Sequence, residues 1–406
     1  MVKIAVLGYG TVGSGVVEVL RTNQKVIDER LGEELRIKYV LDLRDFPDDP
    51  VQELITHDFE DIVNDDEVKI VVEVMGGIEP AYTFVKRSLE AGKSVATSNK
   101  ALVAKHGAEL LRTAKEKNVN FLFEASVGGG IPILRPLHSS LTGDVIEEIT
   151  GILNGTTNYM MTKMFYEGAD YDEVLEEAQD NGFAERNPEA DVEGYDACRK
   201  IAILSSIISG KQVDFEDIYC EGITKITAED MKYAKAMGMT IKLLATCKRD
   251  GGKLNAMVAP CLLRAEHPLF SVNGVFNSIF VHGNMLGDAM FYGSGAGKLP
   301  TASAVVGDIV EEARNLDRNL GVMWSSEKLT LEDRRDVERR FFVRVKGDRE
   351  ELQEQVAAVF GMVQFVQAEG LSGEFGFVTE EMPEGSYEEK AERFGGQILG
   401  MIRVEE

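Results

Sequence analysis

The sequence predicts an α/β protein that begins with a mostly parallel, doubly wound sheet. Apolar runs of strand length alternate with stretches of helical spacing, which is typical of βαβ units. The first run, residues 2–7, ends at a glycine-rich turn, and apolar residues then recur at Val12, Val16, Val17 and Leu20, the spacing of one helix face. Further strands are expected at residues 36–43, 69–74, 94–97 and 119–125, with helices at residues 81–90 and 100–117.

The turn after the first strand reads GYGTVGSG and places glycines at the GxGxxG spacing. The first glycine permits a tight turn, the second allows close approach of a pyrophosphate, and the third lets helix and strand pack. Between a strand and a helix this motif predicts a Rossmann-type dinucleotide site, with the phosphates at the helix N-terminus. A plain strand-to-helix turn is the alternative. The expected cofactor-binding residues here are Gly8, Gly10, Thr11, Val12 and Gly13.

The end of the second strand, DLRD, bears on the choice of cofactor. An acidic residue here binds a ribose 2′-hydroxyl, as in NAD, whereas an arginine accommodates the 2′-phosphate of NADP. Asp42 and Arg44 supply both types. Arg44 can instead form an ion pair with Asp42 or Asp45 at the surface.

The pattern changes after residue 143, where strand candidates are separated by turns. Four of them predict an open mixed sheet that serves as a substrate-binding and dimerisation domain. A helix is expected at residues 300–316. The expected strands are residues 146–154, 241–249, 254–263 and 277–283.

Composition excludes several classes of function. The 406 residues are too many for one ordinary core. A net charge of −25 argues against a nucleic-acid partner. The N-terminus enters a strand directly and no apolar run reaches membrane-spanning length, so we expect a cytoplasmic protein without a membrane partner. The cysteines lack paired spacing, which favours free thiols, and the histidines lack ligand spacing, which disfavours a catalytic transition metal. These residues are Cys198, Cys220, Cys247 and Cys261, and His57, His106, His138, His267 and His282.

Two carboxylates and a lysine near residue 190 suggest chemistry. Asp196 and Lys200 are four residues apart at the start of an apolar helix, residues 196–209, so they share one face. Glu185 lies just upstream in a loop broken by glycine and proline. A lysine beside carboxylates can stay charged, bind a polar substrate and exchange a proton with an alcohol or carbonyl oxygen. The alternative is a surface ion pair, which is common and weak.

The wider context of these residues, AQDNGFAERNPEADVEGYDACRK, resembles the signature of homoserine dehydrogenases. The resemblance continues through SNKA, EASVGGGIP, NGTTNY and GSGAG, and it covers roughly residues 1–320. It implies reversible, NAD(P)-dependent hydride transfer that interconverts L-homoserine and L-aspartate 4-semialdehyde, in threonine, methionine and isoleucine biosynthesis. It also implies a homodimer or a larger homo-oligomer. The chain has Ala184-Glu185-Arg186 where the family often has Thr-Glu-Pro, which bears on the rigidity of that loop.

The resemblance also implies roles for single residues. Lys200 matches the family's acid/base lysine. Lys100 matches a lysine that lies near cofactor and substrate; two nearby ammonium groups lower each other's pKa, which would make Lys200 a better proton carrier. The alternative is that Lys100 is simply exposed to solvent. Substrate binding is expected from Glu185, Asp196, Asp191, Gly155 and Thr156, with Thr156 capping a helix. Further cofactor contacts are Arg44, which tips the choice slightly towards NADP, and Gly76, Ser98, Lys100 and Gly295. A monovalent cation, Na⁺ or K⁺, is expected at Glu124 and the backbone of Val127, Gly129 and Ile131.

The expected domains are a dinucleotide-binding domain of residues 1–142 and 298–320, a substrate and dimerisation domain of 143–297, a linker of 321–337, and a regulatory domain of 338–406. The last resembles a ferredoxin-like ACT domain. Its first turn, residues 347–351, lacks the usual proline. Two interpretations of this domain are therefore open: a structural or dimerising tail, and a threonine sensor. Two other functions stay open: a catalytically silent, nucleotide-binding amino-acid sensor, and a related semialdehyde reductase.

Overall fold

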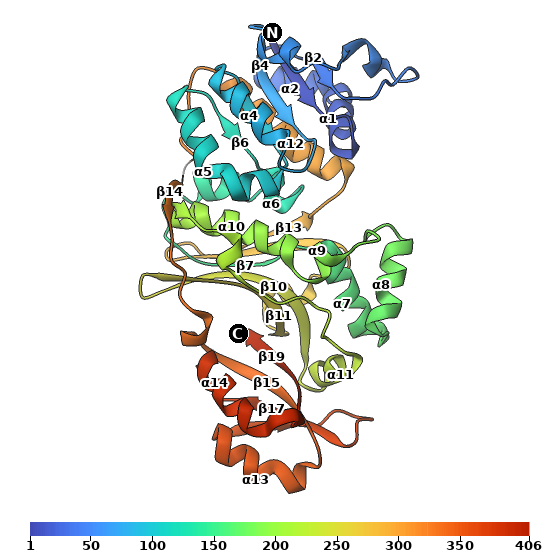
Figure 1. Ribbon diagram of the computed structural model, residues 1–406, viewed down its shortest axis with the longest axis vertical. Helices are drawn as coiled ribbons and strands as arrows, with labels where there is room; N and C mark the ends of the chain where they lie inside the picture. Colours follow the sequence, from blue (N-terminus) through green and yellow to red (C-terminus); the bar gives the residue numbers. More distant parts are fainter. Residues whose placement is uncertain (323, 406) are drawn as a thin grey trace. The chain divides into compact units, whose positions relative to one another are not determined.

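The structure is a computed structural model that describes residues 1–322 and 324–405, and it splits into two compact units (Figure 1). The first unit consists of Met1–Val145, Ala202–Phe215 and Phe291–Leu329. The second consists of Ile146–Ile201, Glu216–Met290 and Thr330–Glu406. No helix among the described residues has the length and apolar character needed to cross a membrane.

The first unit contains a six-stranded sheet of order β3-β2-β1-β4-β5-β6, and all of its pairs are parallel. The side chains of β1 are buried along most of its length, as expected for a parallel strand covered on both faces. Helices α1 and α12 share one apolar cluster with this sheet. The strands are β1 (Val2–Leu7), β2 (Leu35–Leu41), β3 (Ile55–Thr56), β4 (Val68–Glu73), β5 (Ser94–Thr97) and β6 (Phe121–Leu122). The helices are α1 (Thr11–Thr22), α2 (Gln24–Leu31), α3 (Glu60–Val63), α4 (Ala81–Glu90), α5 (Lys100–Glu116), α6 (Ala125–Gly128) and α12 (Lys298–Arg314).

The predicted parallel α/β fold of the N-terminal part is confirmed, but one strand was predicted too long. Residues 119–125 were expected to form a strand, whereas β6 contains only two residues. Glu124 already has helical dihedral angles, and α6 begins at Ala125. The cause is the Glu124 side chain, which accepts hydrogen bonds from a later turn of the chain and bends the backbone away from the sheet.

The second unit carries most of an eleven-stranded mixed sheet, and this part of the predicted fold is also confirmed. Its main path runs β13-β12-β7-β10-β11-β19-β15-β17-β16, while β9 pairs with β11 and β18 with β15. The strands are β7 (Ile146–Ile152), β9 (Tyr219–Cys220), β10 (Met239–Asp250), β11 (Lys253–Arg264), β12 (Phe276–Gly283), β13 (Gly287–Ser294), β15 (Glu338–Lys346), β16 (Val363–Val366), β17 (Glu374–Thr379), β18 (Met382–Pro383) and β19 (Ile398–Glu405). The helices are α7 (Gly155–Glu167), α8 (Tyr171–Asp180), α9 (Glu189–Val192), α10 (Tyr195–Ser209), α11 (Ala228–Ala236), α13 (Arg349–Phe360) and α14 (Glu384–Ala391).

Short helices complete the chain: η1 (Pro50–Leu54), η2 (Pro136–Ser140), η3 (Phe215–Asp217), η4 (Pro268–Ser271), η5 (Arg334–Asp336) and η6 (Glu392–Gln397). Within the segment 321–337, which we expected to be a linker, residues 324–328 pack inside the first unit. There β14 (Ser325–Lys328) pairs with β8 (Lys211–Gln212), and the Trp324 indole donates to Gln212 Oε1 at 2.8 Å. Trp324 is buried against Gly107, where a Cβ atom would lie 2.3 Å from the indole.

The last strands form a βαββαβ arrangement with the antiparallel order β19-β15-β17-β16. Strand β19 also pairs with β11 in parallel, so this arrangement continues the sheet of the substrate-binding part.

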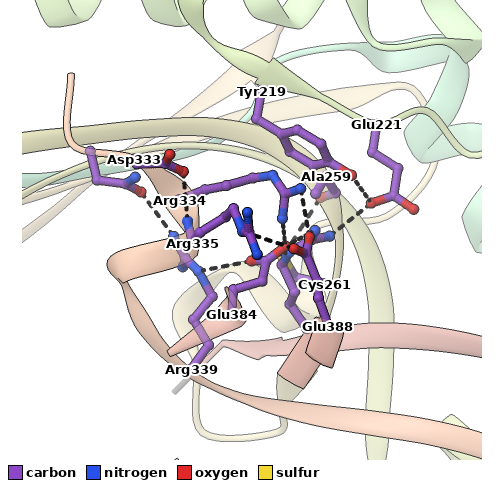
Figure 2. A network of polar contacts seen from close by, with 12 residues as sticks. Tyr219, Glu221, Ala259, Cys261, Asp333, Arg334, Arg335, Arg339, Glu384 and Glu388 are labelled. Atoms are coloured by element: carbon purple, nitrogen blue, oxygen red, sulfur yellow. Dashed lines mark hydrogen bonds and ion pairs between the residues drawn. The ribbon is translucent and has the colours of Figure 1, made fainter. Parts of the chain in front are cut away.

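A network of buried ion pairs fastens the C-terminal strands to β9 and its neighbourhood (Figure 2). Arg403 on β19 donates to both carboxylate oxygens of Glu384, at 3.0 and 2.5 Å, and to Glu221 at 2.8 Å. Arg334 also pairs with Glu384 and lies over the Tyr219 ring, 4.3 Å from its centroid. Glu384 is the shared member, because its removal would take the common carboxylate from both Arg403 and Arg334.

Candidate active site

A buried polar cluster forms in the second unit where α7 and α10 begin. The Lys200 ammonium donates to Asp196 Oδ2 and to the carbonyl oxygen of Leu153, both at 2.7 Å. The Asn154 amide donates to Asp191 Oδ1 at 2.7 Å and to Asp196 Oδ2 at 3.0 Å. Asn154 lies two residues after the end of β7, and carboxylates from α9 and α10 converge on it.

Burial rules out the surface ion pair as an account of Asp196 and Lys200. Their side chains are 6% and 9% exposed. Inside the protein such a pair persists only when hydrogen bonds satisfy both partners, and here Asn154 and the Leu153 carbonyl contribute them. The arrangement keeps an ammonium group in a fixed direction, which suits a proton donor.

The helix α7 begins at Gly155, and its N-cap is Asn154, not Thr156 as predicted. The Asn154 side chain accepts from Thr157 N at 2.9 Å, while Thr156 already lies in the first turn and donates to the Phe183 carbonyl at 2.6 Å. Asparagine and threonine are both good caps, and the position where β7 ends decides between them. Gly155 allows close packing, because a Cβ there would lie 2.7 Å from the Val275 carbonyl oxygen.

Glu185 differs from the buried Asp196–Lys200 pair in its exposure to solvent. It is exposed in the loop between α8 and α9, where its carbonyl accepts from the Gln179 side chain at 3.0 Å. Asp191 is half-buried and reaches Asn154, as described above. The structure therefore assembles Asp191, Asp196 and Lys200 around Asn154 and leaves Glu185 facing solvent.

The first unit carries the glycine turn at the end of β1. Gly8 has φ +98°, and a Cβ there would lie 3.0 Å from Met75 Cγ. A Cβ at Gly13 would lie 2.0 Å from the Gly8 carbonyl oxygen, so only glycine fits where α1 packs on the strand. Gly10, the N-cap of α1, has open space beside it, and Thr11 is exposed while Val12 is half-buried. This geometry fits a pyrophosphate at the helix N-terminus.

Asp42 and Arg44 form a two-point ion pair beside this turn. Arg44 Nε donates to Asp42 Oδ1 at 2.9 Å and Nη2 donates to Oδ2 at 3.0 Å, while Tyr9 N also donates to Oδ2 at 2.8 Å. The Arg44 hydrogen bond, with that of the Tyr9 backbone, holds the pKa of Asp42 well below its usual range. The Arg44 side chain is 63% exposed, so its guanidinium is accessible while it neutralises Asp42.

A second group of polar residues, which sequence reasoning missed, joins the ends of β4 and β5. Thr97 donates to the buried Glu73 carboxylate at 2.6 Å and accepts from Asn99 N at 3.0 Å. Asn99 caps α5 and donates to the Gly77 carbonyl at 2.5 Å. Burial raises the pKa of Glu73. An Asn before a helix and a Glu ending an apolar strand were the available signals.

Three residues that were predicted to contact the cofactor lie next to this network in the chain. Gly76 is exposed and has φ +83°, a conformation that favours glycine. Ser98 donates its N–H to the Glu73 carbonyl at 3.4 Å, and Lys100 is the first residue of α5. All three follow the carboxyl ends of parallel strands, where ligands of such sheets bind.

The predicted cation loop folds around the buried Glu124 side chain. Its carboxylate accepts from Ile133 N at 2.6 Å, Leu134 N at 2.8 Å and Arg135 N at 2.7 Å. Gly129 has φ +58°, and a Cβ there would lie 2.2 Å from the Gly295 carbonyl oxygen. Val127 and Ile131 are buried on either side.

Comparisons with known proteins identify the family. The family model for homoserine dehydrogenase matches residues 132–310, and the model for the NAD binding domain of homoserine dehydrogenase matches residues 8–124. The homoserine dehydrogenase of Bacillus subtilis strain 168 is 45% identical over 328 residues, which are 80% of this chain and 75% of that protein. The chain belongs to the homoserine dehydrogenase family. It is therefore an oxidoreductase that acts on a CH–OH group, and the silent sensor and the related reductase are not favoured.

Solved homoserine dehydrogenases share the fold. The crystal structure of the one from Thiobacillus denitrificans has a TM-score of 0.90 at 33% identity, covering 100% of this chain and 98% of that one. A hyperthermophilic archaeal homoserine dehydrogenase in complex with NADPH has a TM-score of 0.64 at 29% identity, covering 77% of this chain and 97% of that one. The family resemblance drawn from the motifs over roughly residues 1–320 is thus confirmed.

Asn154 is a further residue of the buried cluster that the motifs alone did not single out as part of the site. It is 42 residues from Asp196 in sequence, and its contacts with two carboxylates arise only when α7 and α10 pack. The signal available in the sequence was its place directly after an apolar strand and before a helix.

Proposed function

We propose that this homoserine dehydrogenase interconverts L-homoserine and L-aspartate 4-semialdehyde with Lys200 as the proton donor and acceptor. The observation that carries the proposal is the buried contact of Lys200 with Asp196 and the Leu153 carbonyl, beside the N-terminus of α7. NAD or NADP supplies hydride chemistry at the nicotinamide when bound. The residues of the chain bind the amino acid, orient it and move its hydroxyl proton.

In the reductive direction Lys200 would donate a proton as negative charge develops on the aldehyde oxygen. Asp196 accepts a hydrogen bond from the Lys200 ammonium and fixes its direction, and Asn154 holds the Asp196 carboxylate in place. The first amides of α7, at Gly155 and Thr156, suit the substrate carboxylate because a helix N-terminus attracts anions. Glu185 and Asp191 are proposed to receive the substrate ammonium group.

The cofactor side is assigned to the first unit. Gly8, Gly10, Thr11, Val12 and Gly13 form the pyrophosphate turn, with Gly76, Ser98, Lys100 and Gly295 as further contacts. We lean towards NADP because Arg44 is exposed beside the turn and neutralises Asp42, a carboxylate that would repel a 2′-phosphate. A relative crystallised with NADPH is consistent with this choice.

A monovalent cation, Na⁺ or K⁺, is proposed at the Glu124 loop. A carboxylate offers about four lone-pair directions, and backbone amides occupy three of those of Glu124, so one remains for a cation together with backbone carbonyl oxygens. The carbonyl groups proposed as ligands are those of Val127, Gly129 and Ile131. The donor set of hard oxygens fits such an ion.

The remaining assignments concern the organisation of the chain. We propose the domain limits given above, with residues 338–406 as an ACT-type regulatory domain, supported by its βαββαβ arrangement and antiparallel strand order. We also propose a homodimer or larger homo-oligomer, and an amino acid such as threonine as effector of that domain. A cytoplasmic location is supported by four cysteines that remain free thiols, as expected in a reducing compartment.

The decisive experiment measures absorbance of the reduced nicotinamide with purified protein and L-homoserine at mildly alkaline pH, with NAD and NADP in parallel. We expect homoserine-dependent reduction with a larger kcat/KM for NADP. The reverse assay supplies aspartate 4-semialdehyde with the reduced cofactors. Absence of turnover in both directions with both cofactors would refute the proposal and favour the sensor.

A further inference from the structure

Lys242 is a buried charged residue for which the reaction above has no role. It lies in β10 and is 1% exposed. Its ammonium donates to the Val272 carbonyl at 2.6 Å, to Asn273 Oδ1 at 2.9 Å and to Asn158 Oδ1 at 3.1 Å. All three acceptors are neutral oxygens. Burial lowers the pKa of Lys242 to about 7. A buried ammonium is expensive, so its contacts call for a specific explanation.

The contacts of Lys242 connect it to one loop, residues 272–275. Val272 and Asn273 begin the loop 272–275, which connects η4 to β12. Asn158, in the first half of α7, donates to the Val272 carbonyl at 3.2 Å and to the Phe276 carbonyl at 3.0 Å, so it holds both ends of this loop. Lys242 therefore donates hydrogen bonds to the loop itself and to Asn158, the α7 side chain that holds the two ends of the loop.

The middle of the loop is tied to the same helix. Gly274 N donates to Thr162 Oγ1 at 3.0 Å. The Val275 carbonyl oxygen lies so close to Gly155 that a Cβ there would come within 2.7 Å of it. The loop is thus pressed against the first residue of α7, next to Asn154.

We propose that Lys242 is a positioning residue for homoserine, acting through Asn158 and the loop 272–275. By holding the loop against Gly155, it fixes the first turn of α7 and with it Asn154, which orders Asp191 and Asp196. This inference rests on the proposed function, because it assigns the amino-acid end of the substrate to that turn. It predicts an effect on the substrate and none on the cofactor.

The test is Lys242→Met, which keeps most of the side-chain volume and removes all three N–H donors. We expect the KM for homoserine to rise about ten-fold, the effect of losing about 1.4 kcal/mol, with the KM for NAD(P) unchanged. The matched control is Lys248→Met in the same strand, whose ammonium bonds to Glu405 and Glu148. The control should leave both KM values unchanged, because neither partner belongs to the loop or to α7.

Hydrogen exchange of the peptide that contains residues 272–275 gives a readout independent of activity. We expect faster exchange in Lys242→Met than in wild type or in Lys248→Met. If Lys242→Met does not fold, Thr162→Val carries the test, since valine keeps the shape and removes the acceptor for Gly274 N. It should raise the same KM, by a smaller factor.

The outcomes separate the two proposals. A wild-type protein that does not turn over homoserine refutes the proposed function. In an active wild type, faster loop exchange with a raised KM for homoserine alone supports the positioning role. An unchanged KM for homoserine, or equal changes in the KM of homoserine and cofactor, overturns it and leaves Lys242 as a structural residue only.

Discussion

Replacing Lys200 by methionine separates its catalytic role from its structural one. The change keeps the length of the side chain and removes the ammonium that bonds to Asp196 and to the Leu153 carbonyl. Because Asp196 is then left buried without its cation, the free energy of unfolding should fall by about 3–5 kcal/mol. A typical domain has about 5–15 kcal/mol in total. The variant should therefore remain folded at the assay temperature, but be clearly weakened.

Catalysis should fall by a larger factor. Loss of a positioned general acid and base lowers kcat by about 10²–10⁴-fold. The assay is reduced-nicotinamide absorbance at saturating homoserine, with urea unfolding followed by circular dichroism and cofactor affinity followed by fluorescence titration. We expect the cofactor affinity to be unchanged, because the proposed cofactor contacts lie in other residues.

Two companion variants make the result decisive. The double variant Asp196→Asn, Lys200→Met removes the uncompensated charge, so it should recover stability without recovering turnover. Lys163→Met removes another lysine with an i,i+4 carboxylate, Glu167, in a more exposed pair on α7, and should cost about 0–1 kcal/mol with kcat unchanged. Turnover of Lys200→Met within about ten-fold of wild type would refute the acid/base role. Loss of cofactor binding instead would mean that the role of Lys200 was misplaced.

Two further predictions concern the first unit. Arg44→Ser should raise the KM for NADP about ten- to hundred-fold, because a charged hydrogen bond to the 2′-phosphate is lost. The KM for NAD should be nearly unchanged. Equal effects on both KM values in parallel assays would argue against that contact. Burial, and then the nearby Asp308 carboxyl, raise the pKa of Glu312 well above 4.5. The folded state then holds a proton that the unfolded state releases above pH 4.5, so wild-type stability should fall as pH rises. Glu312→Gln should make this loss smaller. Thermal unfolding at pH 5 and pH 8 tests this, and parallel changes in both proteins would contradict it.

The fold was predictable where the sequence pattern and the burial agree. Strands β1 and β4 read as mainly apolar runs because both faces of a parallel sheet are covered. The pattern failed at residues 119–125, where the apolar run continues but the chain turns into α6. That turn depends on hydrogen bonds from residues 133–135 to Glu124, and such contacts leave no periodic trace in the sequence.

The site was predictable to the extent that its residues are close in sequence. Asp196 and Lys200 lie one helical turn apart, so their contact follows from helix geometry. Asn154 and Lys242 are different, because their partners come from distant segments and depend on packing. Lys242 nevertheless left a local signal: it is a lysine within an apolar run predicted to be a strand, and such a residue needs buried oxygen partners.

The ion network around Arg403 limits how a regulatory signal from residues 338–406 can act. Arg403 and Glu384 are 3% and 1% exposed, and Glu221 near β9 shares the same guanidinium. Separating the C-terminal strands from this neighbourhood would break the Arg403–Glu221 and Arg344–Asp230 pairs and the backbone pairing of β19 with β11, at about 0.5–1.5 kcal/mol for each hydrogen bond lost. An effector typically supplies a coupling of only about 1–3 kcal/mol. An amino acid bound to the proposed regulatory domain therefore cannot work by detaching it. It must act through shifts that keep Arg403, Glu384 and Glu221 together, so that β19 and β11 move as one body.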